Sequence, residues 1–274
     1  MAEPLRVPAY GLDTAGALEV LTVAAFLDLL ANTRFLIGYS GHWNLVLHHK
    51  RMFAPHCHPR EITMSRTLGT ITAEGFTSQI VEEPDGRVHF LADADIDADG
   101  ANGQDGAPAA YKNDDSGTEL LANGGMRVLH GKVVCAQSWA RSIVILGPDN
   151  EPMVFPGGVI ASMTWYRHPG KNRADPSAYV DAETVPYIVV PPLVVQQTAG
   201  VVRGCRARAS YKGKSVDCVV ADLGPARKVG ELSIAAARAL GIPSSPRSGG
   251  TEKQEVLYEL WPGEAAPGYV LQSA

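Results

Sequence analysis

The segment VVRGCRARASYKGKSVDCVVADLGPARKVGELSIAAARALGIP, residues 201–243, carries the clearest local structure in the chain. Two partly alternating apolar runs flank the tetrapeptide YKGK at 211–214, which predicts a β-hairpin whose second strand ends at Asp222. The loop LGPARKVG follows, and the sequence from Glu231 onward predicts a short helix. Strand, tight loop and helix therefore bring one carboxyl group to each side of a short glycine- and proline-containing turn.

Similar short apolar runs, separated by turn residues, recur along the rest of the chain. They include TLGTITAEGF (67–76), RVHFLADA (87–94), MRVLHGKVVC (126–135) and QEVLYELWPG (254–263). Prolines at 186, 191 and 192 interrupt a further run over 185–197, which favours an edge strand or a short bordered strand there. A helix is expected over 13–31. The predicted fold class is mainly β or α+β, with a barrel-like β core and two or three short helices.

Composition limits the classes of partner. The 274 residues carry a formal net charge of -5, with a pI near 5.9, so no nucleic-acid partner is expected. The most apolar stretch near the start, residues 15–31, contains Glu19 and Asp28, which argues against a membrane span. No signal-peptide pattern is visible, and a mature secreted protein stays compatible with the sequence.

Cys205 and Cys218 flank the predicted hairpin turn and could lie on neighbouring strands. Two alternatives follow, a disulfide between them or two buried free thiols. A separate cluster, His56-Cys57-His58, is weak evidence for zinc because a fourth ligand is not apparent, and no metal or other cofactor is expected.

Asp222 and Glu231 are the candidate catalytic pair. Hydrolysis of a glycosidic bond needs two carboxyl groups, one to protonate the leaving oxygen and one to act as nucleophile or as base toward water. The simpler alternative is that Asp222 caps a turn and Glu231 complements the positive end of a helix.

Four aspartates, Asp93, Asp95, Asp97 and Asp99, alternate along FLADADIDADG (90–100) and would share one face of an extended segment. Like charges so close repel one another unless a cation lies among them. The cation could be an amino sugar of a substrate, and the alternatives are a calcium ion or a solvated loop. An EF-hand is not expected, because the twelfth loop position is Gly106 rather than Glu.

The segment around Asp222 resembles the catalytic segment of glycoside hydrolase family 75, the chitosanases, in which a strand-closing Asp precedes a Glu by nine residues in a Gly-Glu-x-Ser context. Here Gly230-Glu231-Leu232-Ser233 matches that context. Residues 90–100, 178–192 and 239–250 are also similar to members of the family. The resemblance covers roughly residues 88–265, departs from the family at Ala98, where members often carry Cys, and says nothing about the first 85 residues.

The chain is expected to have an N-terminal region, residues 1–85, of unknown role and packed on the core, and the resemblance implies a chitosanase-like catalytic domain over 86–274. It implies an endo-acting, inverting, secreted hydrolase of β-1,4 glucosamine linkages in chitosan, a cationic polysaccharide. Glu231 would be the acid, Asp222 the base, and the four aspartates would bind substrate. The helix N-terminus expected at Glu231 should lower its pKa, which opposes an acid role.

Three other readings stay open at this stage. The chain could be a chitin-directed or a peptidoglycan-directed hydrolase, or a carbohydrate-binding cell-wall protein without catalysis. Four aromatic residues could stack on sugar rings in any of these, although aromatic side chains in β-rich proteins more often lie in the core. They are Trp139, Trp165, Tyr166 and Trp261.

Overall fold

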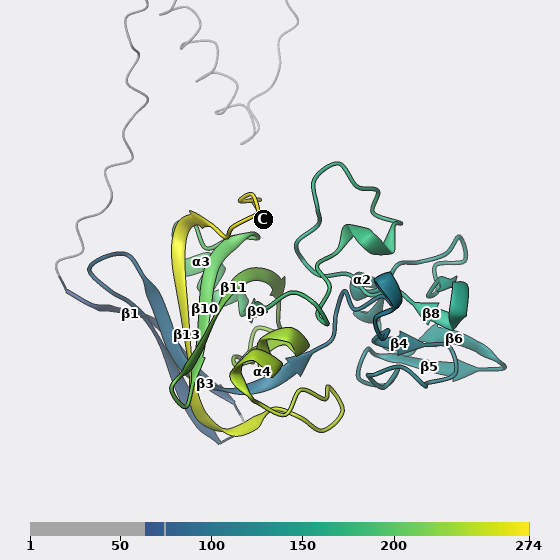
Figure 1. The fold of residues 1–274 in the computed structure, drawn as a ribbon, viewed down its shortest axis with the longest axis horizontal. Helices are drawn as coiled ribbons and strands as arrows, with labels where there is room; N and C mark the ends of the chain where they lie inside the picture. The colour runs from purple at the N-terminus through teal and green to yellow at the C-terminus, as the bar shows by residue number, and fades with distance from the viewer. Residues whose placement is uncertain (1–63, 74, 274) are drawn as a thin grey trace, which may run out of the picture. The chain divides into compact units, whose positions relative to one another are not determined.

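The computed structural model describes residues 64–73 and 75–273, so the helix expected over 13–31 and the cluster His56-Cys57-His58 lie outside the described residues. The described part is mainly β, with a closed six-stranded barrel and three short helices, which confirms the fold class predicted from the sequence (Figure 1). Within it, no helix is long and apolar enough to cross a membrane.

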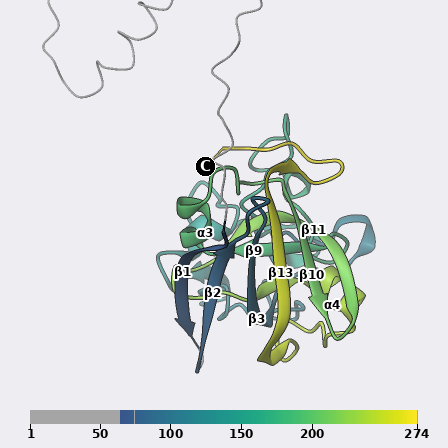
Figure 2. The ribbon, with the colours of Figure 1, turned by 90° about the vertical axis from the view of Figure 1, so that its left-hand side faces the viewer.

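Six strands close the barrel. In order around the wall they are β3 (Val88–Asp97), β12 (Glu231–Ser233), β9 (Tyr187–Val190), β11 (Lys214–Leu223), β10 (Cys205–Tyr211) and β13 (Thr251–Ala265), and β13 pairs back onto β3. The first half of β3 also pairs with β2 (Phe76–Glu82), which forms a hairpin with β1 (Arg66–Ala73). Figure 2 shows this hairpin beside the barrel wall. The described residues before 86 thus extend the sheet of the barrel.

The hairpin predicted around YKGK is present as β10 and β11, with Tyr211 opposite Lys214. Cys205 and Cys218 are free thiols, so the second of the two alternatives holds. Burial raises the pKa of Cys205 to about 11 and that of Cys218 to about 12, so both stay protonated in the core.

Strand β9 is short and bordered by prolines, but it lies inside the sheet rather than at an edge. All four of its residues are buried, and it pairs in parallel with β11 and antiparallel with β12. The prolines lie just outside the paired residues, so their missing N–H groups remove no hydrogen bond between the strands. The residues after it form α3 (Pro192–Gln197) rather than more strand.

Glu231 does not open a helix, so that prediction was wrong. Residues Glu231–Ser233 form β12, paired with β3 on one side and β9 on the other. Helix α4 (Ile234–Leu240) begins three residues later, where the Ser233 hydroxyl accepts a hydrogen bond from the backbone N–H of Ala236 at 3.2 Å. Pairing with two neighbouring strands outweighs the local helix propensity of this segment.

The chain between β3 and β9 forms a separate lobe of short elements, drawn to the right of the barrel in Figure 1. A three-stranded sheet contains β4 (Tyr111–Lys112), β8 (Val159–Ile160) and β7 (Val154–Phe155), and a hairpin contains β5 (Met126–Leu129) and β6 (Lys132–Cys135). Helix α2 (Ala140–Ile143) and the 3-10 turns Gln104–Gly106, Pro156–Gly158 and Pro176–Ala178 complete it. Lobe and barrel belong to one compact unit, residues 58–274.

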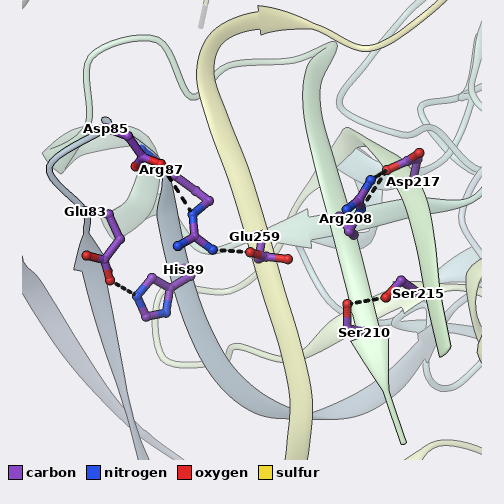
Figure 3. Close-up of polar contacts among 9 residues, drawn as sticks. All are labelled: Glu83, Asp85, Arg87, His89, Arg208, Ser210, Ser215, Asp217 and Glu259. Carbon is purple, nitrogen blue, oxygen red and sulfur yellow. Dashed lines mark hydrogen bonds and ion pairs between the residues drawn. The ribbon is translucent and has the colours of Figure 1, made fainter. Parts of the chain in front are cut away.

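Charges on the outside of the barrel are paired across strands, as Figure 3 shows. Arg87, just before β3, pairs with Glu259 of β13, and Arg208 of β10 lies 2.8 Å from Asp217 of β11. His89 also contacts Glu83 at 2.6 Å. Exposed pairs of this kind contribute little stability each, but they leave no row of like charge on the outer wall that they cover.

Candidate active site

The barrel places Asp222 and Glu231 on the two strands that flank β9. Asp222 pairs with Val189 from one side, and Glu231 pairs with the same Val189 from the other. Glu231 is in turn opposite Asp95 of β3. Neighbouring strands lie about 4.8 Å apart, so the Cα atoms of Asp222 and Glu231 are separated by about 10 Å. Because the two residues flank one strand, their side chains can approach one ligand from two neighbouring positions of the barrel wall.

Two glycines let the loop before Glu231 fold tightly. Gly230 has a φ of +97°, and a Cβ there would meet Asp93 Oδ1 at 2.3 Å, so only glycine fits between the loop and β3. Its carbonyl accepts a hydrogen bond from the Asp95 N–H at 2.7 Å. A Cβ at Gly224 would lie 3.5 Å from Glu231 Oε2, which shows that this carboxyl reaches across the loop toward the end of β11.

Both carboxyl groups line one open cleft with a volume of about 980 Å³ between the barrel and the lobe. Six acidic residues line it against two basic ones, Lys228 and Arg247. The acidic residues are Asp95, Asp97, Asp99, Glu119, Asp222 and Glu231. The cleft therefore differs from the outer wall, where opposite charges are paired, because acidic side chains outnumber basic ones along its lining.

Three of these carboxylates converge. Oxygen atoms of Asp97, Asp99 and Asp222 all lie within 4.8 Å of one another, close enough to hold a divalent cation through oxygen ligands. Asp97 Oδ1 accepts a hydrogen bond from the Asp99 N–H at 2.8 Å. Burial, followed by the neighbouring charge of Asp97, raises the pKa of Asp99 well above its ordinary value, so the cluster retains protons well above pH 4.

The pKa of Glu231 is raised to about 8, first by burial and next by the charge of Asp97, while Lys228 acts in the opposite direction. The difficulty expected from a helix N-terminus disappears, because Glu231 lies in a strand. A carboxyl group that keeps its proton at neutral pH has the property that a general acid needs.

Asp222 differs from Glu231 in its hydrogen bonds. Burial and then Asp97 raise its pKa as well, but its Oδ1 accepts two backbone hydrogen bonds, from Leu223 N at 2.7 Å and from Trp165 N at 3.1 Å. Such donors favour the ionised form. These two hydrogen bonds oppose the rise that burial and Asp97 cause in the pKa of Asp222, which still lies well above its ordinary value.

The four aspartates of residues 93–99, three in β3 and Asp99 just after it, have different surroundings. Asp95, Asp97 and Asp99 line the cleft, and Asp95 Oδ2 lies 2.6 Å from Lys228 Nζ. Asp93 is only 2% exposed and is not among the residues that line the cleft. Its effect on a ligand in this structure would be electrostatic, because its charge also contributes to the raised pKa of Glu231.

The lobe supplies cleft residues that the sequence did not indicate. Glu119 is 6% exposed, and its Oε1 accepts hydrogen bonds from Leu120 N at 2.5 Å and Asn123 Nδ2 at 2.9 Å. Arg247, from the chain between α4 and β13, donates hydrogen bonds to three backbone carbonyls of lobe residues 115–119. No periodicity marks such residues, because they come from loops far from Asp222 in the sequence.

A scan against protein-family models finds no family that matches this chain, and a search of curated proteins finds no match.

Proposed function

We propose that this protein is an endo-acting glycoside hydrolase that cleaves β-1,4 glucosamine linkages of chitosan with inversion, using a carboxylic acid and a carboxylate. The observation that carries this proposal is the pairing of Glu231 and Asp222 across Val189 within an acidic cleft. The resemblance of residues 222–233 to the chitosanase segment supports the same assignment. Because chitosan is an extracellular polymer, the proposal includes secretion.

In this mechanism Glu231 is the general acid. With a pKa of about 8, it holds a proton at neutral pH and donates it to the glycosidic oxygen as the bond to the anomeric carbon breaks. Asp222, ionised and held by two backbone N–H groups, accepts a proton from a water molecule that attacks the anomeric carbon from the opposite face. After one turnover Glu231 is ionised and Asp222 protonated, and solvent restores both.

The acidic lining accounts for the choice of substrate. Glucosamine units carry ammonium groups at mildly acidic pH, and carboxyl oxygens of Asp97 and Asp99 lie within 4.8 Å of one of Asp222, the proposed base. An ammonium group bound there stabilises the ionised form of these carboxylates. Chitin and peptidoglycan, with acetylated amines, supply far fewer such charges.

Reducing-end release from chitosan, chitin and peptidoglycan, measured in parallel, tests the substrate. We expect release from chitosan at mildly acidic pH. KM should rise as salt is added, because salt screens the attraction between the cleft carboxylates and the polymer beyond about 8 Å at physiological ionic strength. Polarimetry or NMR of the first anomer released should show inversion. Release from chitin or peptidoglycan but not from chitosan would contradict the proposal.

Lys228 should set the alkaline limit of activity. Its Nζ atom lies 2.6 Å from Asp95 Oδ2 of β3, and it lowers the pKa of Glu231, whereas the charges of Asp97, Asp95 and Asp93 raise it. Lys228→Met should therefore move the alkaline limb of the kcat/KM profile to higher pH by roughly one unit, the usual scale for one close charge. Lys253→Met removes an exposed lysine near Glu255 and should leave the profile in place. An unmoved alkaline limb in Lys228→Met would show that Glu231 is not the group that titrates.

A further inference from the structure

Of the four aromatic residues that the sequence indicated, Trp139 is the one that lines the cleft. Tyr166 is 1% exposed, and the rings of Trp165 and Trp261 lie under guanidinium groups, of Arg203 at 5.3 Å and of Arg206 at 4.3 Å. Trp139 is 48% exposed and lines the cleft that holds Asp222 and Glu231. It comes from the lobe, whereas the pair comes from the barrel.

The indole of Trp139 is held in place by its neighbours. It packs against Gly125, where an added Cβ would lie 2.9 Å from Cζ2 and 3.0 Å from Cη2 of the ring. The Gly125 carbonyl accepts hydrogen bonds from the N–H groups of Ala136 and Gln137 at 2.8 and 2.9 Å, which ties the start of this loop to the same glycine. The Trp139 carbonyl accepts a further bond from Ser142 Oγ at 2.6 Å.

A half-exposed aromatic ring at a cleft indicates a ligand-binding groove when other apolar residues are exposed beside it and polar residues surround them. Leu223, which directly follows Asp222, is 39% exposed in the same cleft, and Pro225 and Pro246 also line it. Apolar surface from both the lobe and the barrel side thus accompanies the acidic residues of the cleft. A pyranose ring needs this combination, because its C–H face is apolar while its rim is polar, and in glucosamine the rim carries a cation.

We infer that Trp139 forms a sugar-binding subsite of the cleft, in which a pyranose ring of a glucosamine chain stacks on the indole while the chain extends across the acidic residues of the cleft to the Asp222–Glu231 pair. The inference rests on the proposed function and adds a specific subsite to it. Trp139 binds a sugar unit and does not take part in bond cleavage. Its loss should weaken binding more than it slows the chemical step, because such binding is nearly equal in ground and transition states.

Kinetics on chitosan test the subsite with three variants. Trp139→Ala should raise KM about tenfold with a smaller change in kcat, whereas Trp139→Phe, which keeps a stacking face, should raise it only two- to threefold. Val154→Ala is the matched control, because Val154 is also 48% exposed but is not among the residues that line the cleft, and its KM should stay at the wild-type value. Circular dichroism and melting curves check that each variant is folded.

Binding to the Glu231→Gln protein separates this inference from the proposed function. A glucosamine hexamer is titrated into the Glu231→Gln protein and into the double variant that also carries Trp139→Ala, and tryptophan fluorescence is recorded. Quenching that disappears with Trp139→Ala supports the subsite even if the wild-type protein releases no reducing ends, in which case only the proposed function fails. Hydrolysis with an unchanged KM in Trp139→Ala overturns the subsite and leaves the function standing. If the hexamer is neither bound nor hydrolysed, both the Trp139 subsite and the proposed function are overturned.

Discussion

Replacing Glu231 by Gln is expected to lower kcat on chitosan at least about a hundredfold, and Asp222→Asn is expected to have an effect of the same size. Gln keeps the shape of Glu but has no proton to give, and Asn cannot accept one from water. The measurement is initial-rate release of reducing ends over pH 4 to 9. Glu231→Gln should abolish the alkaline limb of the residual profile and Asp222→Asn the acidic limb, which assigns acid and base separately.

Asp217→Asn is the matched control for these substitutions. Asp217 lies on the same strand as Asp222, but it faces the outer wall and pairs with Arg208 (Figure 3). Its replacement should leave turnover unchanged. Turnover near the wild-type value in either Glu231→Gln or Asp222→Asn, with a normal melting curve, would show that the residue concerned is not catalytic.

Asp97→Asn is expected to stabilise the protein at pH 8. The charge of Asp97 contributes to the raised pKa of Asp99, Asp222 and Glu231, so it opposes ionisation of the whole cluster. Asn keeps the Oδ1 atom that accepts the hydrogen bond from Asp99 N. If the loss of repulsion from Asp97 lowers the pKa of its neighbours by one unit in total, the free energy of unfolding rises by about 1.4 kcal/mol. That change raises the melting temperature by roughly 3 to 6 °C in a domain of this size.

The pH dependence of this effect has a definite sign. Carboxyl groups whose pKa is raised by folding bind more protons in the native than in the unfolded state. Wild-type stability should therefore fall as pH rises from about 4.5, the ordinary value for Glu, to about 8, the folded value for Glu231. The gain from Asp97→Asn should be largest at pH 8 and vanish near pH 4, as measured by calorimetry.

Calcium binding would give the opposite result. If Asp97, Asp99 and Asp222 held calcium, Asp97→Asn would lower the melting temperature in its presence, and a chelator would lower that of the wild type to match. A fall in the melting temperature of Asp97→Asn at pH 8 in chelator would contradict repulsion as the dominant effect. Asp217→Asn, which loses an exposed ion pair, should change stability by well under 1 kcal/mol.

The sequence was most informative where structure is local. The hairpin of β10 and β11 follows from alternation around a turn, and the strand that carries the aspartates follows from an apolar run. It was misleading at Glu231, because ELSIAAARAL favours a helix locally, and only pairing with β3 and β9 makes its first three residues a strand. That pairing joins segments more than 40 residues apart in the chain, which no local pattern records.

The candidate site shows the same division. Its two carboxyl groups could be proposed from the short segment that contains both, but their electrostatic environment could not. Burial of Glu231 depends on the loop–β3 contact at Gly230, and the lobe residues Glu119 and Trp139 reach the cleft through loops without periodicity. Burial and long-range neighbours decide pKa and subsite, and both are properties of the folded chain.

Closure of the barrel by β13 determines when the candidate site is complete during folding. β3, which carries Asp95 and Asp97, closes the barrel by pairing with a strand that the ribosome makes more than 150 residues later. Pairings of such long sequence separation form slowly, because the intervening chain must be ordered first. Until β13 is in place, β3 and β10 each lack a neighbouring strand. The barrel is then open, and the strands that carry Asp222, Glu231 and Asp95 are not held in a closed sheet. The proposed activity should therefore appear only after β13 has paired with β3 and β10, so the rate of product formation during refolding would report the rate of barrel closure.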